Sequence, residues 1–229
     1  MTTDDNDLVA VATDGGVEAL ESVWLERVND PPEARVFLDA FEALSEPHQR
    51  SAAPTLLGTL FEAYRSSDRH ADALAVLQLL LPHRPRNLDG PEVVKETLGK
   101  LYGGEEWFAL FVELSQLGDD DIGDALDRFQ ALVRLLPGSP VFHKTGWGEG
   151  IITAVDLPER SFDVTFRRDG RSRNMPFTTG LDVLRPLPLD DLRARLLAYA
   201  EGLKADASDN PSVLIRAVAR LHKGRATSK

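Results

Sequence analysis

Residues 141–177 read VFHKTGWGEGIITAVDLPERSFDVTFRRDGRSRNMPF, and this stretch decides the fold of the second half of the chain. Apolar and polar residues alternate in it, as at Phe162, Val164 and Phe166, with the period of two that is typical of strands with one buried face. The pattern predicts four strands, over 141–144, 148–156, 161–167 and 171–177. The pair Asp169-Gly170 predicts a hairpin between the last two. Together these short, strongly bent strands predict a small β-barrel of the SH3 or Tudor kind.

Residues 17–136 carry a different pattern, in which apolar residues recur at spacings of three and four. Leu56, Leu60 and Tyr64 are one example, and short breakers such as Asn29-Asp30-Pro31-Pro32 separate the segments. This pattern predicts about seven amphipathic helices joined by tight turns. An aromatic helix end, a polar turn and an Ala-rich helix recur in 63–85 and 101–137. We interpret the region as tetratricopeptide-like (TPR-like), with an irregular helical bundle as the alternative.

These patterns divide the chain into four expected parts, and the expected fold class is α+β. Residues 1–15 are expected to be a flexible acidic N-terminus, and 16–137 an α-helical TPR-like repeat domain. A turn-rich joint, LPGSP at 136–140, leads into the small β-barrel expected at 138–187. Helical spacing returns from Pro188, so that 188–229 are expected to form C-terminal helices and a basic tail.

Composition excludes several classes of function. The chain of 229 residues has no cysteine, which excludes disulfides, thiolate metal sites and cysteine nucleophiles. The formal net charge of -11 disfavours sequence-independent wrapping of nucleic acid, although the basic residues after Ile215 leave local contact with DNA or RNA open. No apolar run approaches the roughly 20 residues of a membrane span, and no signal peptide is recognised. We therefore expect a cytoplasmic protein with no membrane role.

A glycine cluster at 146–150 has the spacing of a phosphate-binding loop. Such a loop opens a helix, whose N-terminus holds the phosphate. Here the β-branched Ile151 and Ile152 follow and predict a strand, so we interpret the cluster as a tight bend at the start of that strand.

Other signals of catalysis are weak. The acidic run Asp119-Asp120-Asp121 could hold magnesium, but capping of the next helix is the commoner use of such residues. The five histidines are not paired at metal-ligand spacing, and no nucleophile with a partner base is recognised. We therefore expect no catalytic, cofactor-binding or metal-binding residues, and we expect that the chain is not an enzyme.

The predicted barrel offers a basic surface with aromatic residues, of the kind that small barrels use to bind a protein or a nucleic-acid strand. Solvated hairpin charges around an aromatic core are the alternative interpretation. The residues expected to bind a partner are Lys144, Trp147, Phe166, Arg167, Arg168 and Arg171.

Several features resemble a known family in their order and spacing. They are Gly146-Trp147-Gly148 with Gly150, the alternating Val164 and Phe166, Leu184 with Pro186-Leu187-Pro188, and Asn210-Pro211 with Val213 and Ile215. Over about residues 140–225 the chain resembles the Tudor-like module of bacterial transcription and repair proteins that contact RNA polymerase. It is similar in particular to the N-terminal region of long, N-terminally extended Gre-type transcription elongation factors.

The resemblance implies a non-catalytic accessory module that docks on RNA polymerase or its nucleic acid. Members of that family cleave transcripts with a long coiled coil whose acidic tip holds magnesium, beside a globular domain that binds the polymerase. Neither part is recognised here, since helices of about 13 residues flanking Asp119 reach only about 20 Å. Transcript cleavage is therefore not carried over, and the chain is either a truncated piece of such a factor or a stand-alone relative. A general helical-repeat scaffold for protein interactions is the alternative function.

Overall fold

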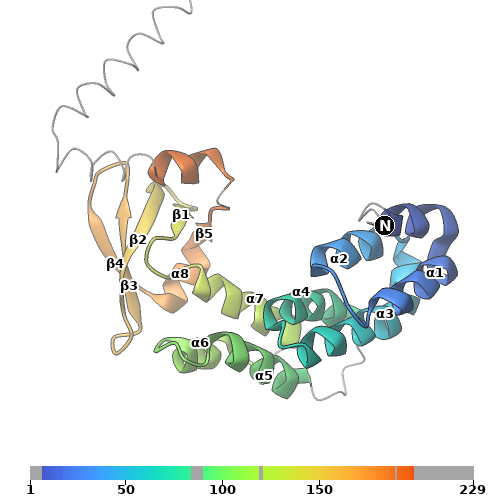
Figure 1. The fold of residues 1–229 in the computed structure, drawn as a ribbon. Helices are drawn as coiled ribbons and strands as arrows, with labels where there is room; N and C mark the ends of the chain where they lie inside the picture. Colours follow the sequence, from blue (N-terminus) through green and yellow to red (C-terminus); the bar gives the residue numbers. More distant parts are fainter. Residues whose placement is uncertain (1–6, 84–89, 119–120, 189, 199–229) are drawn as a thin grey trace, which may run out of the picture. The chain divides into compact units, whose positions relative to one another are not determined.

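A computed structural model of the chain describes residues 7–83, 90–118, 121–188 and 190–198 (Figure 1). The contacts divide it into two compact units, residues 1–129 and 130–229. Helices make up the first unit, and an antiparallel sheet with short helices follows in the second. The expected α+β class is therefore confirmed. Within the described residues, every helix is too short or too polar to cross a membrane.

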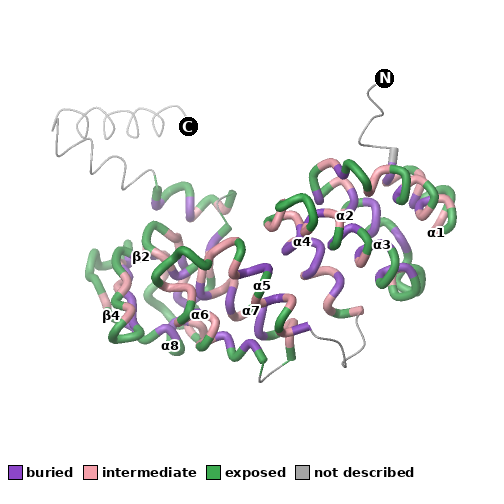
Figure 2. Tube along the Cα trace, turned by 60° about the horizontal axis from the view of Figure 1, so that its bottom comes forward, coloured by how far each residue is buried: buried purple, intermediate pink, exposed green. Residues whose placement is uncertain are grey.

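The helices of the first unit follow the breakers that the sequence predicts. They are α1 (Asp7–Arg27), α2 (Ala34–Glu42), α3 (Glu46–Ser66), α4 (His70–Leu80), the 3-10 turn η1 (Leu81–His83), α5 (Gly90–Tyr102), α6 (Phe108–Ser115) and α7 (Ile122–Val133), which ends in the second unit. The amphipathic helices are confirmed, and Figure 2 shows buried positions recurring along them between exposed ones. The TPR-like repeat stays a prediction.

The acidic start of the chain differs from the expectation. Residues 7–15 belong to α1 rather than to a flexible terminus, because Leu8 and Ala12 are buried one turn apart on the same helix face. The helix is kinked at Gly16, whose φ of 68° departs from helical geometry. Residues 1–6 lie outside the described residues.

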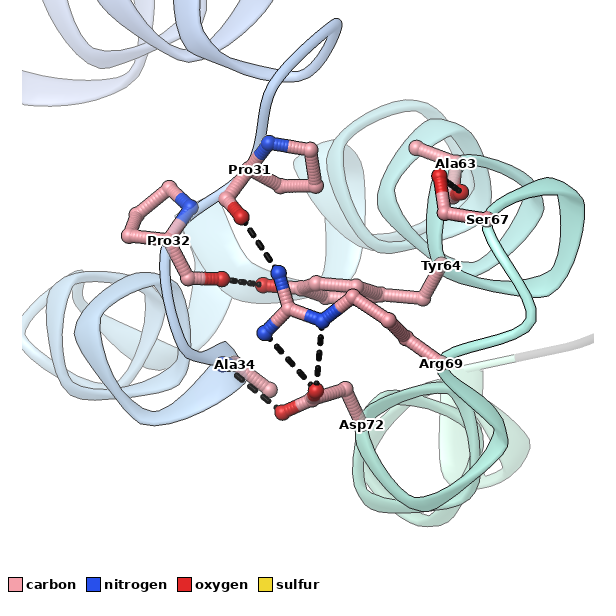
Figure 3. Close-up of polar contacts among 8 residues, drawn as sticks. All are labelled: Pro31, Pro32, Ala34, Ala63, Tyr64, Ser67, Arg69 and Asp72. Atoms are coloured by element: carbon pink, nitrogen blue, oxygen red, sulfur yellow. Dashed lines mark hydrogen bonds and ion pairs between the residues drawn. The ribbon is translucent and has the colours of Figure 1, made fainter.

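Tyr64 and Arg69 fasten the connection between α1 and α2 to the α3–α4 pair (Figure 3). The Tyr64 hydroxyl donates to the carbonyl oxygen of Pro32 at 2.7 Å, and Arg69 donates to the carbonyl oxygen of the proline before it. Arg69 also pairs with Asp72 at 2.8 Å, and that carboxylate accepts the backbone N–H of Ala34 at 3.1 Å. Burial raises the pKa of Tyr64 well above its usual value, so its hydroxyl stays a donor.

The sheet of the second unit has five strands in the order β4-β3-β2-β1-β5, all antiparallel. They are β1 (Pro140–His143), β2 (Gly148–Asp156), β3 (Ser161–Phe166), β4 (Ser172–Pro176) and β5 (Leu184–Pro186), with α8 (Phe177–Val183) between the last two. The four expected strands are confirmed to within a residue at each end. The sheet is not closed, since β4 and β5 are its two edges, and the SH3 or Tudor-like barrel is therefore not confirmed.

Glycines set two of the tight turns of this sheet, those before β2 and before β4. The expected bend is confirmed, since Gly146 and Gly148 have φ values of 130° and 79° directly where β2 begins. The β3–β4 hairpin is confirmed as well, but it needs a positive φ only at Gly170, at 65°. Asp169 keeps an ordinary φ because the loop, residues 167–171, is longer than a two-residue turn, and the Asp169 carboxylate accepts the backbone N–H of Arg171 at 3.1 Å.

A short helix over 192–198 follows the sheet. The Asp191 carboxylate caps it by accepting the backbone N–H of Arg193 at 2.8 Å, which confirms the cap expected at Asp190 or Asp191. Ala194 and Leu197 are buried against Leu187. The second helix expected in this region, opening at Asn210, lies outside the described residues.

Replacing Arg69 with alanine is expected to lower the free energy of unfolding by about 2 kcal/mol, because a partly buried ion pair and a hydrogen bond to a backbone carbonyl are lost together. Denaturant unfolding of the full chain measures this change. Arg65→Ala is the matched control, since in the described part of the chain Arg65 pairs with the exposed carboxylates of Glu62 and Glu96, and its replacement should cost less than about 1 kcal/mol. Equal effects of the two variants would contradict the role given to Arg69.

Gly180→Ala is expected to destabilise the second unit by about 1–3 kcal/mol. A Cβ atom at Gly180 would lie 2.5 Å from two ring atoms of Phe162, a side chain that is fully buried and tilted against Phe177. Gly104→Ala is the control, because nothing lies within 4 Å of its Cβ position. Thermal unfolding followed by circular dichroism tests this packing, and an unchanged melting temperature for Gly180→Ala would refute it.

Candidate partner-binding site

Trp147 lies at the centre of the candidate site, in the connection between β1 and β2. Its ring stacks on His143 with the centroids 4.2 Å apart, and it meets Phe166 edge to face at 5.3 Å. The guanidinium carbon of Arg173 lies over the same ring, 4.2 Å from its centroid. These contacts hold Trp147 in one place while 37% of the residue stays exposed. A fixed and partly exposed tryptophan is a suitable anchor for a protein partner.

Phe166 has a different role from the one expected. It is fully buried on β3, so it cannot touch a partner and instead forms the floor beneath Trp147 and His143. The alternation of β3 explains this, because Phe162, Val164 and Phe166 all face the core. Phe166 therefore supports the site and does not contribute to its surface.

The expected cations are exposed, and two of them tie neighbouring loops together. Arg168 Nη1 donates to the carbonyl oxygen of Gly146 at 2.8 Å, which fastens the β3–β4 loop to the connection that carries Trp147. Lys144 Nζ donates to the carbonyl oxygen of Asp182 at 2.8 Å. Because their partners are carbonyl oxygens, both side chains keep their full charge and spare donors for a partner.

Arg167 and Arg171 stand on the same loop. Arg167 forms an ion pair with Glu149 at 3.4 Å, so part of its charge is already matched. The side chain of Arg171 is exposed beside Asp169, whose carboxylate is engaged mainly by backbone N–H and by Arg173. Arg171 is therefore the cation of this loop that is best placed to meet a new partner.

Arg173 belongs to the site although it is not among the residues expected there. This side chain bridges Trp147 and Asp169, with an ion pair of 2.7 Å to that carboxylate, and its buried Nε has no hydrogen-bond partner among the described residues. Alternation gives its strand face, because Arg173 lies two residues before the buried Met175 on β4, but alternation does not give its contact with Trp147. The backbone N–H of Arg171 donates to the Asp169 carboxylate, and so does the side chain of Arg173. Both interactions lower the pKa of the Asp169 carboxyl and keep this group ionised.

His143 is buried below Trp147. Burial lowers the pKa of its imidazole, and the positive charge of Arg173 lowers it further. Its Nδ1 accepts the backbone N–H of Thr145 at 3.3 Å, which requires that nitrogen to be unprotonated. At neutral pH the side chain that supports Trp147 is therefore an uncharged ring.

The acidic run after α6 serves as a cap where it is described. Asp121 Oδ1 accepts the backbone N–H of Gly123 at 2.9 Å at the start of α7, which confirms the capping interpretation at this residue. Asp119 and Asp120 lie outside the described residues. Across the described part of the chain, no cluster of three or more histidine or acidic residues could hold a metal ion. The expected lack of metal, cofactor and catalytic residues stays a prediction.

Comparison with known proteins shows similarity to one kind of factor. Over 202 residues, 87% of this chain, the sequence is 26% identical to a protein of Chlamydia pneumoniae named transcription elongation factor GreA. A protein of the same name from Chlamydia trachomatis serovar D is 32% identical over 90 residues, 39% of this chain. The chain spans 28% of the first relative and 13% of the second. No family model matches the chain, and no solved structure matches it.

This similarity bears out one part of the expected resemblance. Over most of its length the chain is similar to a protein named as a Gre transcription elongation factor, the kind of factor that the residues around Trp147 led us to expect. The narrower likeness, to the N-terminal region of extended members, stays a prediction, as do its TPR-like and Tudor-like parts.

The His143 imidazole is expected to titrate below the ordinary histidine value of about 6.5. Because the unfolded chain then binds a proton more readily than the folded one, this group stabilises the fold fully above about pH 6.5 and loses that contribution as the pH falls toward its folded pKa. An NMR titration of the His143 ring protons measures the midpoint. Arg173→Met should raise the midpoint, since a cation and part of the cover are removed together. A midpoint at or above 6.5 in the unaltered chain would contradict the burial of a neutral ring.

Proposed function

We propose that this chain is a non-catalytic, transcription-elongation-related module that binds RNA polymerase. The observation that carries the proposal is the similarity to a GreA protein over 87% of the chain, a stretch that includes most of both compact units. Binding of the polymerase by this chain would not need catalytic groups, and the proposal does not include transcript cleavage.

We propose further that the helices are a TPR-like scaffold and that the sheet is an SH3- or Tudor-like module. The tight helical hairpin of α3 and α4, to which Tyr64 and Arg69 fasten the connection between α1 and α2, supports the first part. Five short antiparallel strands, of which the last returns to pair beside the first, support the second.

The contact surface that we propose is the basic rim, defined as Lys144, Trp147, Arg167, Arg168 and Arg171. These residues come from two loops that Arg168 and Arg173 hold together, and all five are exposed. The rim is locally positive, whereas the chain as a whole has a net charge of -11. Electrostatic attraction therefore orients the chain so that the rim faces an acidic surface.

An acidic protein surface fits the rim better than a nucleic-acid strand. Single strands are usually held by bases that stack on open aromatic faces. Here His143 and Arg173 already lie against the Trp147 ring at 4.2 Å each, and Phe166 is buried. A partner therefore meets the edge of Trp147 and the surrounding cations, which suits carboxylates and apolar side chains of a protein.

Binding of the full chain to core RNA polymerase from the source organism tests this function. Trp147→Ala and Arg171→Glu are each expected to weaken binding by about tenfold or more, because an anchor is lost in the first and a cation meets acidic groups with the wrong sign in the second. Surface plasmon resonance at two salt concentrations measures the affinity, and higher salt should weaken binding of the unaltered chain.

Arg134→Glu is the matched control, since it makes the same charge change at an exposed residue of the second unit outside the rim. Its affinity should stay close to that of the unaltered chain. No measurable binding of polymerase by the unaltered chain would refute the function itself. Binding that survives both rim variants but is lost on substitutions in the helical unit would instead favour the general helical-repeat scaffold.

A further inference from the structure

Trp147 is held by contacts of its ring, while the backbone on either side of it has room to move. Gly146 and Gly148 flank it with φ values of 130° and 79°, a region that glycine enters at little cost. Nothing lies within 4 Å of the Cβ position of either glycine. The two glycines therefore allow the connection between β1 and β2 to swing, and the ring contacts decide where Trp147 lies.

His143 supplies the ring contact that a proton can change. Its ring is 5% exposed and stacks on Trp147 with an interplanar angle of 26°. Its Nδ1 accepts the backbone N–H of Thr145, two residues before Trp147, at 3.3 Å. A proton on Nδ1 turns this acceptor into a donor, so that two N–H groups face each other. The new N–H can turn to the Thr145 hydroxyl, 3.4 Å away, but the backbone N–H of Thr145 then loses its acceptor.

Arg173 of β4 adds a positive charge beside the same rings. Its guanidinium carbon lies 4.2 Å from the centroid of Trp147, and Asp169 of the β3–β4 loop is already paired with it at 2.7 Å. Burial lowers the pKa of the His143 ring, and the charge of Arg173 lowers it further. A protonated His143 is therefore close to a cation whose carboxylate partner is already engaged, and separation of the rings relieves the repulsion.

The charged groups on the other elements around the imidazole do not offset the added charge. Glu149 on β2 and Arg185 on β5 are both paired with the residue before the histidine, so alternation turns their side chains to the other face of the sheet. Arg167, after the end of β3, is paired with Glu149 at 3.4 Å. Lys144 follows the histidine and adds a positive charge, and its Nζ donates to the carbonyl oxygen of Asp182 on α8.

We propose that His143 is a proton-operated switch for the candidate site: when its ring takes up a proton, Trp147 leaves the ring stack and the basic rim loses its anchor. A swing of the connection also moves the carbonyl oxygen of Gly146, to which Arg168 donates at 2.8 Å, so the β3–β4 loop is released with it. The switch acts below about pH 6.5, the ordinary value for histidine. The release of Trp147 stands on the ring contacts, whereas its effect on a partner rests on the proposed function.

Fluorine NMR of the full chain labelled with 5-fluorotryptophan tests the release. The chain has three tryptophans, and Trp147→Phe identifies the signal of Trp147. As the pH falls, this signal is expected to move toward the position of free 5-fluorotryptophan, with the same midpoint as the His143 ring protons. The signals of Trp24 and Trp107, both in the first unit, should stay fixed over the same range.

His143→Phe keeps an aromatic ring that cannot take up a proton, so the Trp147 signal of this variant should not move with pH. His48→Phe makes the same change at an exposed histidine of α3 and should leave the titration of Trp147 as it is in the unaltered chain. His143→Asn, which keeps an acceptor for the backbone N–H of Thr145, replaces the first variant if that one does not fold.

Two results would overturn the proposal. One is a Trp147 signal that stays fixed while the His143 ring titrates, or that still moves in the variants of His143. The other is a joint movement of all three tryptophan signals, since acid would then unfold the whole chain and not release one connection.

Binding to core RNA polymerase gives a second readout. Between neutral pH and about one pH unit below the His143 midpoint, the affinity of the unaltered chain should fall about fivefold more than that of His143→Phe, because the protonated chain lacks the Trp147 anchor. Equal pH dependence of the two chains would contradict the effect on a partner. Lack of binding at every pH would refute the proposed function instead, and the fluorine signals would still decide whether Trp147 is released.

Discussion

The packing of the Trp147 ring against His143, Arg173 and Phe166 is the interaction on which the candidate surface depends. It joins side chains from β1, from the connection to β2, from β3 and from β4, four segments that the sheet alone would not bring to one point. The buried, neutral imidazole of His143 lets the stack lie directly on the core. Beside the stack, the hydrogen bond from Arg168 to Gly146 and the contacts of Arg167 with Glu149 hold the basic loop at 167–171 next to the start of β2.

Electrostatics then decide what the surface can bind. Much of the chain is acidic, yet the cations of the rim are oriented by carbonyl oxygens and by a few carboxylates and remain exposed. Preorganised side chains lose less conformational entropy on binding, which raises the affinity even when the contact area is small. The cations of the rim attract acidic groups locally, whereas the net charge of -11 opposes binding to a broad negative surface.

The sequence predicted the strands where alternation was long and the turns where glycine was needed. Strand β2 has the predicted bounds, and the Asp169-Gly170 hairpin lies where it was expected. The three-residue strand β5 and the seven-residue helix α8 were missed, because elements so short carry no measurable period and are held in place by pairing with β1 and packing on Phe162.

The structure brings Trp147 close to the loop that carries three of the expected arginines, but their role in binding a partner stays a prediction. Trp147 and the exposed cations were recognisable by residue type and position. Phe166 was misassigned, since its alternation with Phe162 and Val164 places all three side chains on the buried face of β3. The role of Arg173 depends on a contact with Trp147 across the sheet, and neither spacing nor composition encodes such a contact. Whether five strands form an open sheet or a closed barrel is likewise set by edge pairing, which the alternation of single strands does not encode.

Hydrogen–deuterium exchange of the full chain, with and without core RNA polymerase, tests the central claim most directly. The account predicts slower exchange on binding in the peptides that cover 144–147 and 167–173, with little change in the helices of the first unit. Protection confined to those helices, or no protection anywhere at saturating polymerase, would contradict the claim that the basic rim is the contact surface.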